Sequence, residues 1–168
     1  MLKLLCPDLF LDNIYALDHK YLKERGIKGI ITDLDNTLVP WNERSFYPRL
    51  GSWLRELQRE GLKVCIVSNN SHQRGAEMAD ALGVPAVWKA VKPRRIAFRR
   101  ALKMLNLAPE EVAVIGDQIF TDILGGNRLS LYTILVTPIN KREFIGTRIM
   151  RCLERLVISQ LKKRGLFP

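Results

Sequence analysis

Residues 27–38, with the sequence IKGIITDLDNTL, join a short apolar segment to a run of acidic and polar side chains. The first half, residues 27–32, is apolar and β-branched, which is typical of a strand buried on both faces. Two aspartates, Asp33 and Asp35, follow directly. Ligands of open α/β sheets bind beyond the carboxyl ends of the strands. The segment therefore predicts an α/β protein with a ligand site at Asp33.

Strand and helix patterns alternate along the rest of the chain. Further buried strands are predicted at residues 62–67, 84–88, 112–115 and 131–136. Helices are predicted from Asp12 to residue 24 or 25 and near residues 48–60, 71–82, 93–106 and 119–127. This alternation predicts a Rossmann-like parallel sheet with helices on both faces. We expect one domain over residues 1–168, with its catalytic core at about 27–136.

Composition excludes several classes of protein. With 168 residues and 47% hydrophobic content, the chain can bury a core without disulfides or structural metal. Its three cysteines show no C-x-x-C spacing, so neither a disulfide framework nor a zinc site is indicated. No apolar run approaches the roughly 18 residues of a membrane span. We therefore expect a cytoplasmic protein, with a peripheral position at the inner membrane surface as the alternative.

The net charge of +10 is concentrated in two basic blocks, residues 89–103 and 141–168. Such blocks are either solvated helix faces or surfaces for anionic partners. The second block predicts a basic amphipathic helix at about residues 141–164, whose apolar residues at helical spacing are Ile145, Ile149, Leu153, Leu156 and Leu161. This helix either packs on the domain or binds an anionic membrane. Arg151 and Arg155 are expected to be exposed basic residues on this helix.

Polar side chains follow four of the predicted strands. They are Asp33 and Asp35 after the first, Ser68 and Asn69 after the second, Lys92 after the third, and Asp117 and Asp122 after the fourth. Each group alone is weak evidence, since D-x-D pairs often form caps and turns, Ser68 could cap a helix, and Lys92 could be a surface charge. Because all four occur in order at strand ends, coincidence is a poor explanation.

This set of side chains suits phosphoryl transfer. Clustered carboxylates need a cation among them, and hard oxygen ligands favour Mg²⁺. A hydroxyl and an ammonium group suit the oxygens of a phosphoryl group. One carboxylate can attack phosphorus while a second, two residues later, transfers the proton.

With these motifs, the sequence resembles the haloacid dehalogenase (HAD) superfamily of phosphohydrolases. The match consists of D-x-D-x-T-L at residues 33–38, Ser68, Lys92, and Gly116-Asp117 with Asp122. The resemblance implies a phosphoaspartyl intermediate, with Asp33 as nucleophile and Asp35 as general acid/base. It further implies Mg²⁺ held by the side chains of Asp33 and Asp117 and the carbonyl of Asp35. The remaining implied roles are phosphate binding by Ser68, Asn69 and Lys92, and support of the site by Thr37 and Asp122.

Within that superfamily, the chain resembles the YqeG subgroup, which is similar to mitochondrial and plastid phosphatidylglycerophosphate phosphatases. Phosphatidylglycerophosphate is therefore the leading substrate expectation, and a soluble sugar or nucleotide phosphate is the alternative. The segments between the motifs are too short for a cap domain, so we expect an open site. A nucleic-acid-binding or ribosome-associated module is the alternative from another class, but no aromatic-rich nucleic-acid motif supports it. The oligomeric state is left open.

Overall fold

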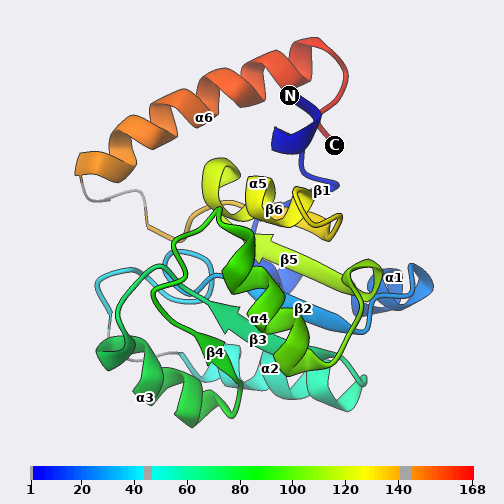
Figure 1. Cartoon of the computed structure of the whole chain (residues 1–168), viewed down its shortest axis with the longest axis vertical. Helices are drawn as coiled ribbons and strands as arrows, with labels where there is room; N and C mark the ends of the chain where they lie inside the picture. The colour runs from blue at the N-terminus through cyan, green and yellow to red at the C-terminus, as the bar shows by residue number, and fades with distance from the viewer. Residues whose placement is uncertain (1, 44–46, 141–144) are drawn as a thin grey trace.

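The computed structural model describes residues 2–43, 47–140 and 145–168, with residues 72–74 and 145–148 described by their backbone only. Six parallel strands form one sheet in the order β1-β6-β5-β2-β3-β4 (Figure 1). The strands are β1 (Leu9–Leu11), β2 (Gly29–Thr32), β3 (Lys63–Val67), β4 (Ala86–Val87), β5 (Val112–Gly116) and β6 (Tyr132–Val136). The predicted parallel α/β sheet is confirmed.

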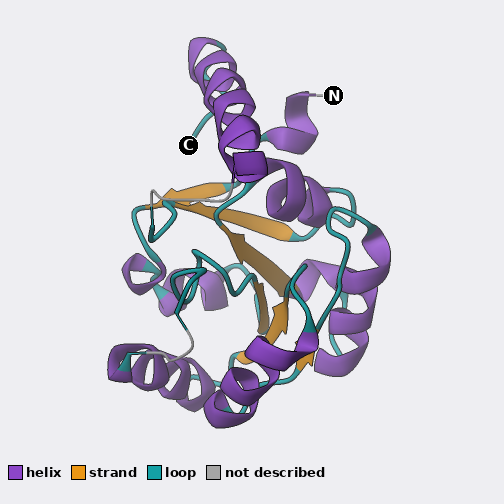
Figure 2. Cartoon of the chain, turned by 90° about the vertical axis from the view of Figure 1, so that its left-hand side faces the viewer, coloured by secondary structure: helices purple, strands orange, loops and turns teal. Residues whose placement is uncertain are grey.

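Helices cover both faces of this sheet, as Figure 2 shows. One face carries α1 (His19–Glu24), α2 (Pro48–Arg59) and α3 (His72–Leu82), and the other carries α4 (Arg95–Leu105) and α5 (Leu124–Asn127). The longest helix, α6 (Ile145–Lys163), lies outside these two layers. The short helical turns are η1 (Leu2–Leu5), η2 (Ile14–Ala16), η3 (Pro109–Glu111) and the π-helical η4 (Ile119–Ile123).

Neighbouring residues of one strand belong to opposite halves of the core. Ile30 of β2 packs in the cluster that includes Leu54 of α2, whereas Ile31 packs in the cluster that includes Phe98 of α4. Successive side chains of a strand point to opposite faces of a sheet. The continuous apolar strand sequence is therefore explained by helices on both faces.

The predicted start of the first helix at Asp12 is wrong, whereas its predicted end at residue 24 or 25 is confirmed. Residues 9–11 instead form β1, which pairs with β6, and the Asp8 carboxylate accepts the N–H of Thr133 at 2.7 Å. Helix α1 begins later, where the Asp18 carboxylate accepts the N–H of Lys20 at 2.8 Å. A three-residue strand is too short to show a periodic pattern, so the first capping residue was assigned six positions too early.

Helix α6 packs on the domain, which was one of the two arrangements predicted for it. Leu161 is buried, and Val157 and Ile158 pack against the cluster of Ile119 and Ile123. Of the other predicted apolar residues, Ile149, Leu153 and Leu156 form a row that stays exposed, with 63%, 46% and 61% accessible. Positions 141–144 of the predicted helix lie outside the described residues. None of the described helices is both long enough and apolar enough to cross a membrane.

Replacing Gly125 by Ala is expected to destabilise the face formed by α4 and α5. A Cβ at Gly125 would lie 2.3 Å from Cε2 of the buried Phe98. Overpacking of this kind costs about 1–3 kcal/mol, which urea denaturation would measure as a lower free energy of unfolding. The cost should shrink in a Phe98→Leu background, which frees space at this contact. Equal costs in both backgrounds would contradict this account.

Candidate active site

The carboxyl ends of β2, β3 and β5 bring the predicted site residues together. Thr32 of β2 is in register with Ile66 of β3 and Ile115 of β5, so the three strands end at one edge of the sheet. Asp33 follows β2, Ser68 follows β3, and Asp117 follows β5. In the sheet, β2 lies between β3 and β5, and the chain continues from β2 to β3 on one side. The candidate site therefore lies where an open sheet of this kind binds ligands.

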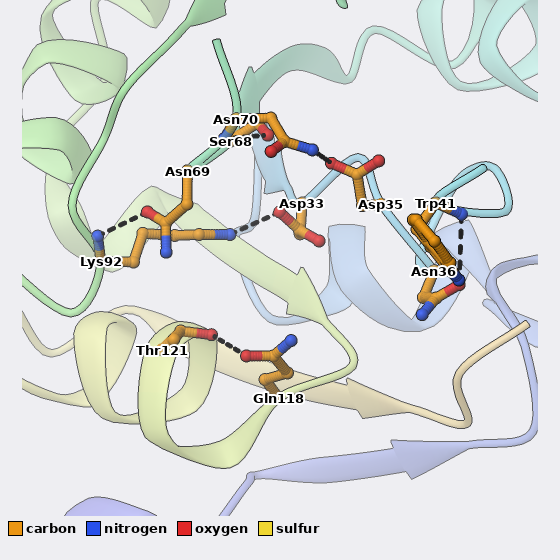
Figure 3. Close-up of a pocket in the computed structure, with 10 residues that line it drawn as sticks. All are labelled: Asp33, Asp35, Asn36, Trp41, Ser68, Asn69, Asn70, Lys92, Gln118 and Thr121. Carbon is orange, nitrogen blue, oxygen red and sulfur yellow. Dashed lines mark hydrogen bonds and ion pairs between the residues drawn. The ribbon is translucent and has the colours of Figure 1, made fainter. Parts of the chain in front are cut away.

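A tight turn after β2 places two aspartates on the same side. Leu34 and Leu38 are buried, and the N–H of Leu38 donates to the carbonyl of Leu34 at 3.0 Å. Asn36 adopts a left-handed φ of 63°, a conformation that asparagine tolerates better than most residues. Asp33 and Asp35 consequently both line the pocket (Figure 3).

Lys92 joins two of the carboxylates. Its Nζ lies 2.6 Å from Oδ1 of Asp33 and 2.6 Å from Oδ1 of Asp122, and 3% of its side chain is exposed. The backbone N–H of Lys92 donates to Oδ1 of Asn69 at 2.7 Å. Burial alone would lower the pKa of Lys92, but Asp122 and Asp33 outweigh it and raise the pKa. Lys92 is therefore a fixed positive charge beside Asp33, and Asn69 holds its backbone.

Three aspartates form an acidic cluster, in which one oxygen each of Asp33, Asp117 and Asp122 lies within 4.8 Å of the others. Burial raises the pKa of Asp33 to about 8 against the opposing effect of Lys92. Burial likewise raises the pKa of Asp117 to about 6, against the opposing effect of Arg151. Carboxylates that are costly to ionise together suit a hard divalent cation. The donor set therefore fits the predicted metal.

Asp35 is placed differently from the acidic cluster. Nδ2 of Asn70 donates to its Oδ2 at 2.6 Å, and the backbone N–H of Asn70 donates to Oγ of Ser68 at 3.1 Å. The carboxylate of Asp35 is not part of the three-aspartate cluster. The Asp35 carboxylate is thus held by Asn70, apart from the three clustered carboxylates.

These groups surround a cavity of about 450 Å³ at the sheet edge. Figure 3 shows the Lys92 ammonium pointing toward Asp33 from one wall and Asn70 pointing toward Asp35 from another. Trp41, which follows the Asp33 turn, also lines the cavity. The lining residues are Asp33, Asp35, Asn36, Trp41, Ser68, Asn69, Asn70, Lys92, Gln118 and Thr121.

Gly116 allows Asp122 to reach the cluster. A Cβ at Gly116 would lie 2.3 Å from Cγ of Asp122, which no ordinary contact permits. Asp122 belongs to the π-helical turn η4, whose wider backbone is frequent at functional sites. Its carboxylate contacts the ammonium group of Lys92 at 2.6 Å. Thr37 supports the site in a different way, because its Oγ1 donates to Oδ1 of Asp117 at 3.1 Å.

Arg151 of α6 is a site residue that the sequence did not reveal. Its guanidinium contacts the carboxylate and the carbonyl oxygen of Asp117, although it was predicted to be a surface charge. That prediction is wrong for Arg151, whereas Arg155 is exposed as expected. Nothing in the local pattern of a basic helix distinguishes Arg151, which turns inward, from Arg155, which is exposed. Asn70 was also missed, although it follows directly after Ser68 and Asn69.

Comparison with known proteins finds relatives among hydrolases and phosphatases. Residues 41–129 match the family model described as haloacid dehalogenase-like hydrolase. The chain is 47% identical over 163 residues to the probable phosphatase YqeG of Bacillus subtilis, covering 97% of this chain and 95% of that protein. It is 25% identical to the chloroplastic/mitochondrial phosphatidylglycerophosphate phosphatase 1 of Arabidopsis thaliana, covering 96% of this chain. The chain spans about half of that relative's length, 49%.

A solved structure shares the fold. The cobalt-bound deoxy-D-mannose-octulosonate 8-phosphate phosphatase of Haemophilus influenzae superposes with a TM-score of 0.57 at 17% identity. The superposition covers 85% of this chain and 92% of that protein. This solved structure therefore has the Rossmann-like architecture without a cap domain that was predicted for the chain.

Proposed function

Since the chain belongs to the haloacid dehalogenase-like hydrolase family and is a phosphatase of that family, we propose that it hydrolyses a phosphate monoester through a phosphoaspartate on Asp33. The observation that carries this proposal is the buried Lys92, which contacts Asp33 inside a cluster of three aspartates. An ammonium group fixed beside a carboxylate at a cavity suits the stabilisation of a transferring phosphoryl group.

The residues divide the reaction into two displacements. An oxygen of Asp33 attacks phosphorus, the bond from phosphorus to the ester oxygen breaks, and Asp35 gives a proton to the leaving alkoxide. Asp35 then takes a proton from water, which attacks phosphorus and releases inorganic phosphate and the Asp33 carboxylate. Ser68 and Lys92 bind the phosphoryl oxygens in both displacements. Asn70 holds the Asp35 carboxylate in place through its 2.6 Å hydrogen bond.

The acidic cluster supports a bound divalent cation in this mechanism. We propose Mg²⁺, because the available donors are carboxylate and carbonyl oxygens, which are hard ligands. Asp33, Asp117 and the carbonyl of Asp35 would hold the ion. When bound, Mg²⁺ would neutralise negative charge on the phosphoryl group. Asp122 is engaged by Lys92 and would support the site indirectly.

For the substrate, we propose a phospholipid head group, with phosphatidylglycerophosphate as the first candidate. The similarity to the Arabidopsis enzyme suggests it, and the exposed row of Ile149, Leu153 and Leu156 on α6 offers an apolar surface for a bilayer. Basic residues at the end of the same helix, Lys162 and Lys163, would attract anionic lipid. A soluble sugar or nucleotide phosphate is the alternative substrate.

A substrate panel tests both possibilities. We expect Mg²⁺-dependent release of phosphate from phosphatidylglycerophosphate in mixed micelles, and slower release from soluble sugar and nucleotide phosphates. The double variant Leu153→Glu with Leu156→Glu should reduce lipid turnover and binding to anionic vesicles, because it places acidic groups on the exposed row. Its turnover of a small soluble ester should stay at the wild-type value.

Met104→Glu provides the matched control, because Met104 is also an exposed apolar residue but lies on α4. It should leave lipid turnover unchanged. Equal losses on lipid and soluble substrates in the double variant would mean that the row supports the fold alone. Fast turnover of a soluble phosphate without lipid would favour the alternative substrate.

A further inference from the structure

We propose that Arg151 is a positioning residue for the candidate metal ligand Asp117, so that docking of helix α6 completes the active site. The inference rests on the proposed function, because it takes Asp117 as a ligand of the metal. It assigns a role in the reaction to a helix that begins beyond residues 41–129, the part of the chain that the family model matches.

Both oxygens of the Asp117 carboxylate have donors. Nη2 of Arg151 contacts Oδ2, and Oγ1 of Thr37 donates to Oδ1 at 3.1 Å. Nη1 of Arg151 also contacts the backbone carbonyl of Asp117. The guanidinium therefore holds the residue by its main chain and its side chain together. Each carboxylate oxygen keeps a further acceptor position that can face a cation.

Glu154 connects Arg151 to the segment that carries Asp122. Its Oε2 accepts from Nη1 of Arg151 at 2.9 Å, and its Oε1 accepts the backbone N–H of Ile119 at 2.6 Å. Ile119 begins the π-helical turn η4, in which Asp122 lies. Glu154 is itself buried, and its contacts join one turn of α6 to η4, which follows β5. A displacement of α6 would therefore remove the Arg151 contacts from Asp117 and the Glu154 contact from the turn that carries Asp122.

The burial of the Asp117–Arg151 ion pair also supports a positioning role for Arg151. The side chain of Asp117 is fully buried, and 17% of that of Arg151 is exposed. Without Arg151, the buried Asp117 side chain would keep only the Thr37 hydroxyl as a side-chain donor, so its Oδ2 would be free to move away from the position that faces a metal. Partners that hold a ligating carboxylate typically change metal affinity or activity about 10- to 100-fold when they are removed. Arg151 thus has the contacts and burial of such a partner.

Metal binding by variants of the full chain tests this assignment. Isothermal titration with Mg²⁺ should show about 10- to 100-fold weaker binding by Arg151→Ala. Arg151→Lys should recover only part of the loss, because an ammonium group cannot reproduce the planar fork of donors. Arg155→Ala is the matched control, since Arg155 is an exposed arginine on the same helix. It should bind Mg²⁺ like the wild type.

The outcomes separate the two claims. Failure of the wild type to bind Mg²⁺ or to release phosphate would contradict the proposed function itself. Normal wild-type binding together with unchanged or tighter binding by a folded Arg151→Ala would overturn the role of Arg151. Should Arg151→Ala not fold, Arg151→Lys decides, because wild-type affinity in that variant would show that the fork of donors is not needed. A lower melting temperature with unchanged Mg²⁺ affinity would also overturn the proposal, as it would indicate a structural role only.

Discussion

Asp33→Asn is expected to abolish hydrolysis of phosphate esters. An amide is a poor nucleophile, so the phosphoenzyme cannot form, although the side chain keeps its size and its place beside Lys92. Losing the nucleophile of a covalent mechanism lowers kcat by a factor on the order of 10⁶. Steady-state phosphate release would measure the loss, and acid quenching with labelled substrate would show that no phosphoenzyme accumulates.

Asp35→Asn is the informative companion to this variant. In the proposed mechanism it removes the proton donor and base but leaves the nucleophile, so it should still form a phosphoenzyme from a substrate with a good leaving group. That intermediate should then persist, because its hydrolysis lacks a base. Circular dichroism and thermal unfolding would establish that both variants fold. Turnover retained by a pure, folded Asp33→Asn preparation would contradict the nucleophilic role.

Much of the fold follows from short-range patterns in the sequence. Five of the six strands were predicted because each is a compact apolar run, and the helices predicted near residues 48–60 and 71–82 correspond to α2 and α3. Strand β1 was missed because three residues carry no period and its pairing with β6 is a contact across the whole chain. The predicted start of the first helix failed for a local reason, since Asp12 and Asp18 are both acceptable capping residues and only Asp18 caps α1.

The candidate site shows the same limit. Asp33, Ser68, Lys92 and Asp117 could be grouped from the sequence because strand ends of a parallel sheet meet at one edge. The inward turn of Arg151 depends on how a terminal helix docks, and a helical pattern does not encode that orientation. An exposed apolar row and a buried polar contact occur on the same helix, α6, so amphipathic spacing alone could not tell which of its residues face the domain.

Lys92→Ala is expected to lower turnover by about two to three orders of magnitude. The ammonium group lies 2.6 Å from Asp33, where negative charge must be stabilised during phosphoryl transfer. Loss of one preorganised electrostatic donor costs roughly 3–4 kcal/mol in the transition state, which corresponds to this change in kcat. The variant also leaves Asp33 and Asp122 without their shared cation, so its melting temperature should fall.

The loss of activity must therefore be separated from the loss of stability. Lys92→Arg keeps the charge between the two carboxylates, and it should recover stability more fully than turnover, because its larger planar group cannot take the same place between them. Lys89→Ala is the matched control, since Lys89 is an exposed lysine three residues away. The kcat values of these variants should be compared at a temperature well below the melting temperature of each. A loss below about fivefold in folded Lys92→Ala, set against the 10²–10³ expected for an electrostatic donor, would show that Lys92 supports the buried aspartates without acting on the phosphoryl group.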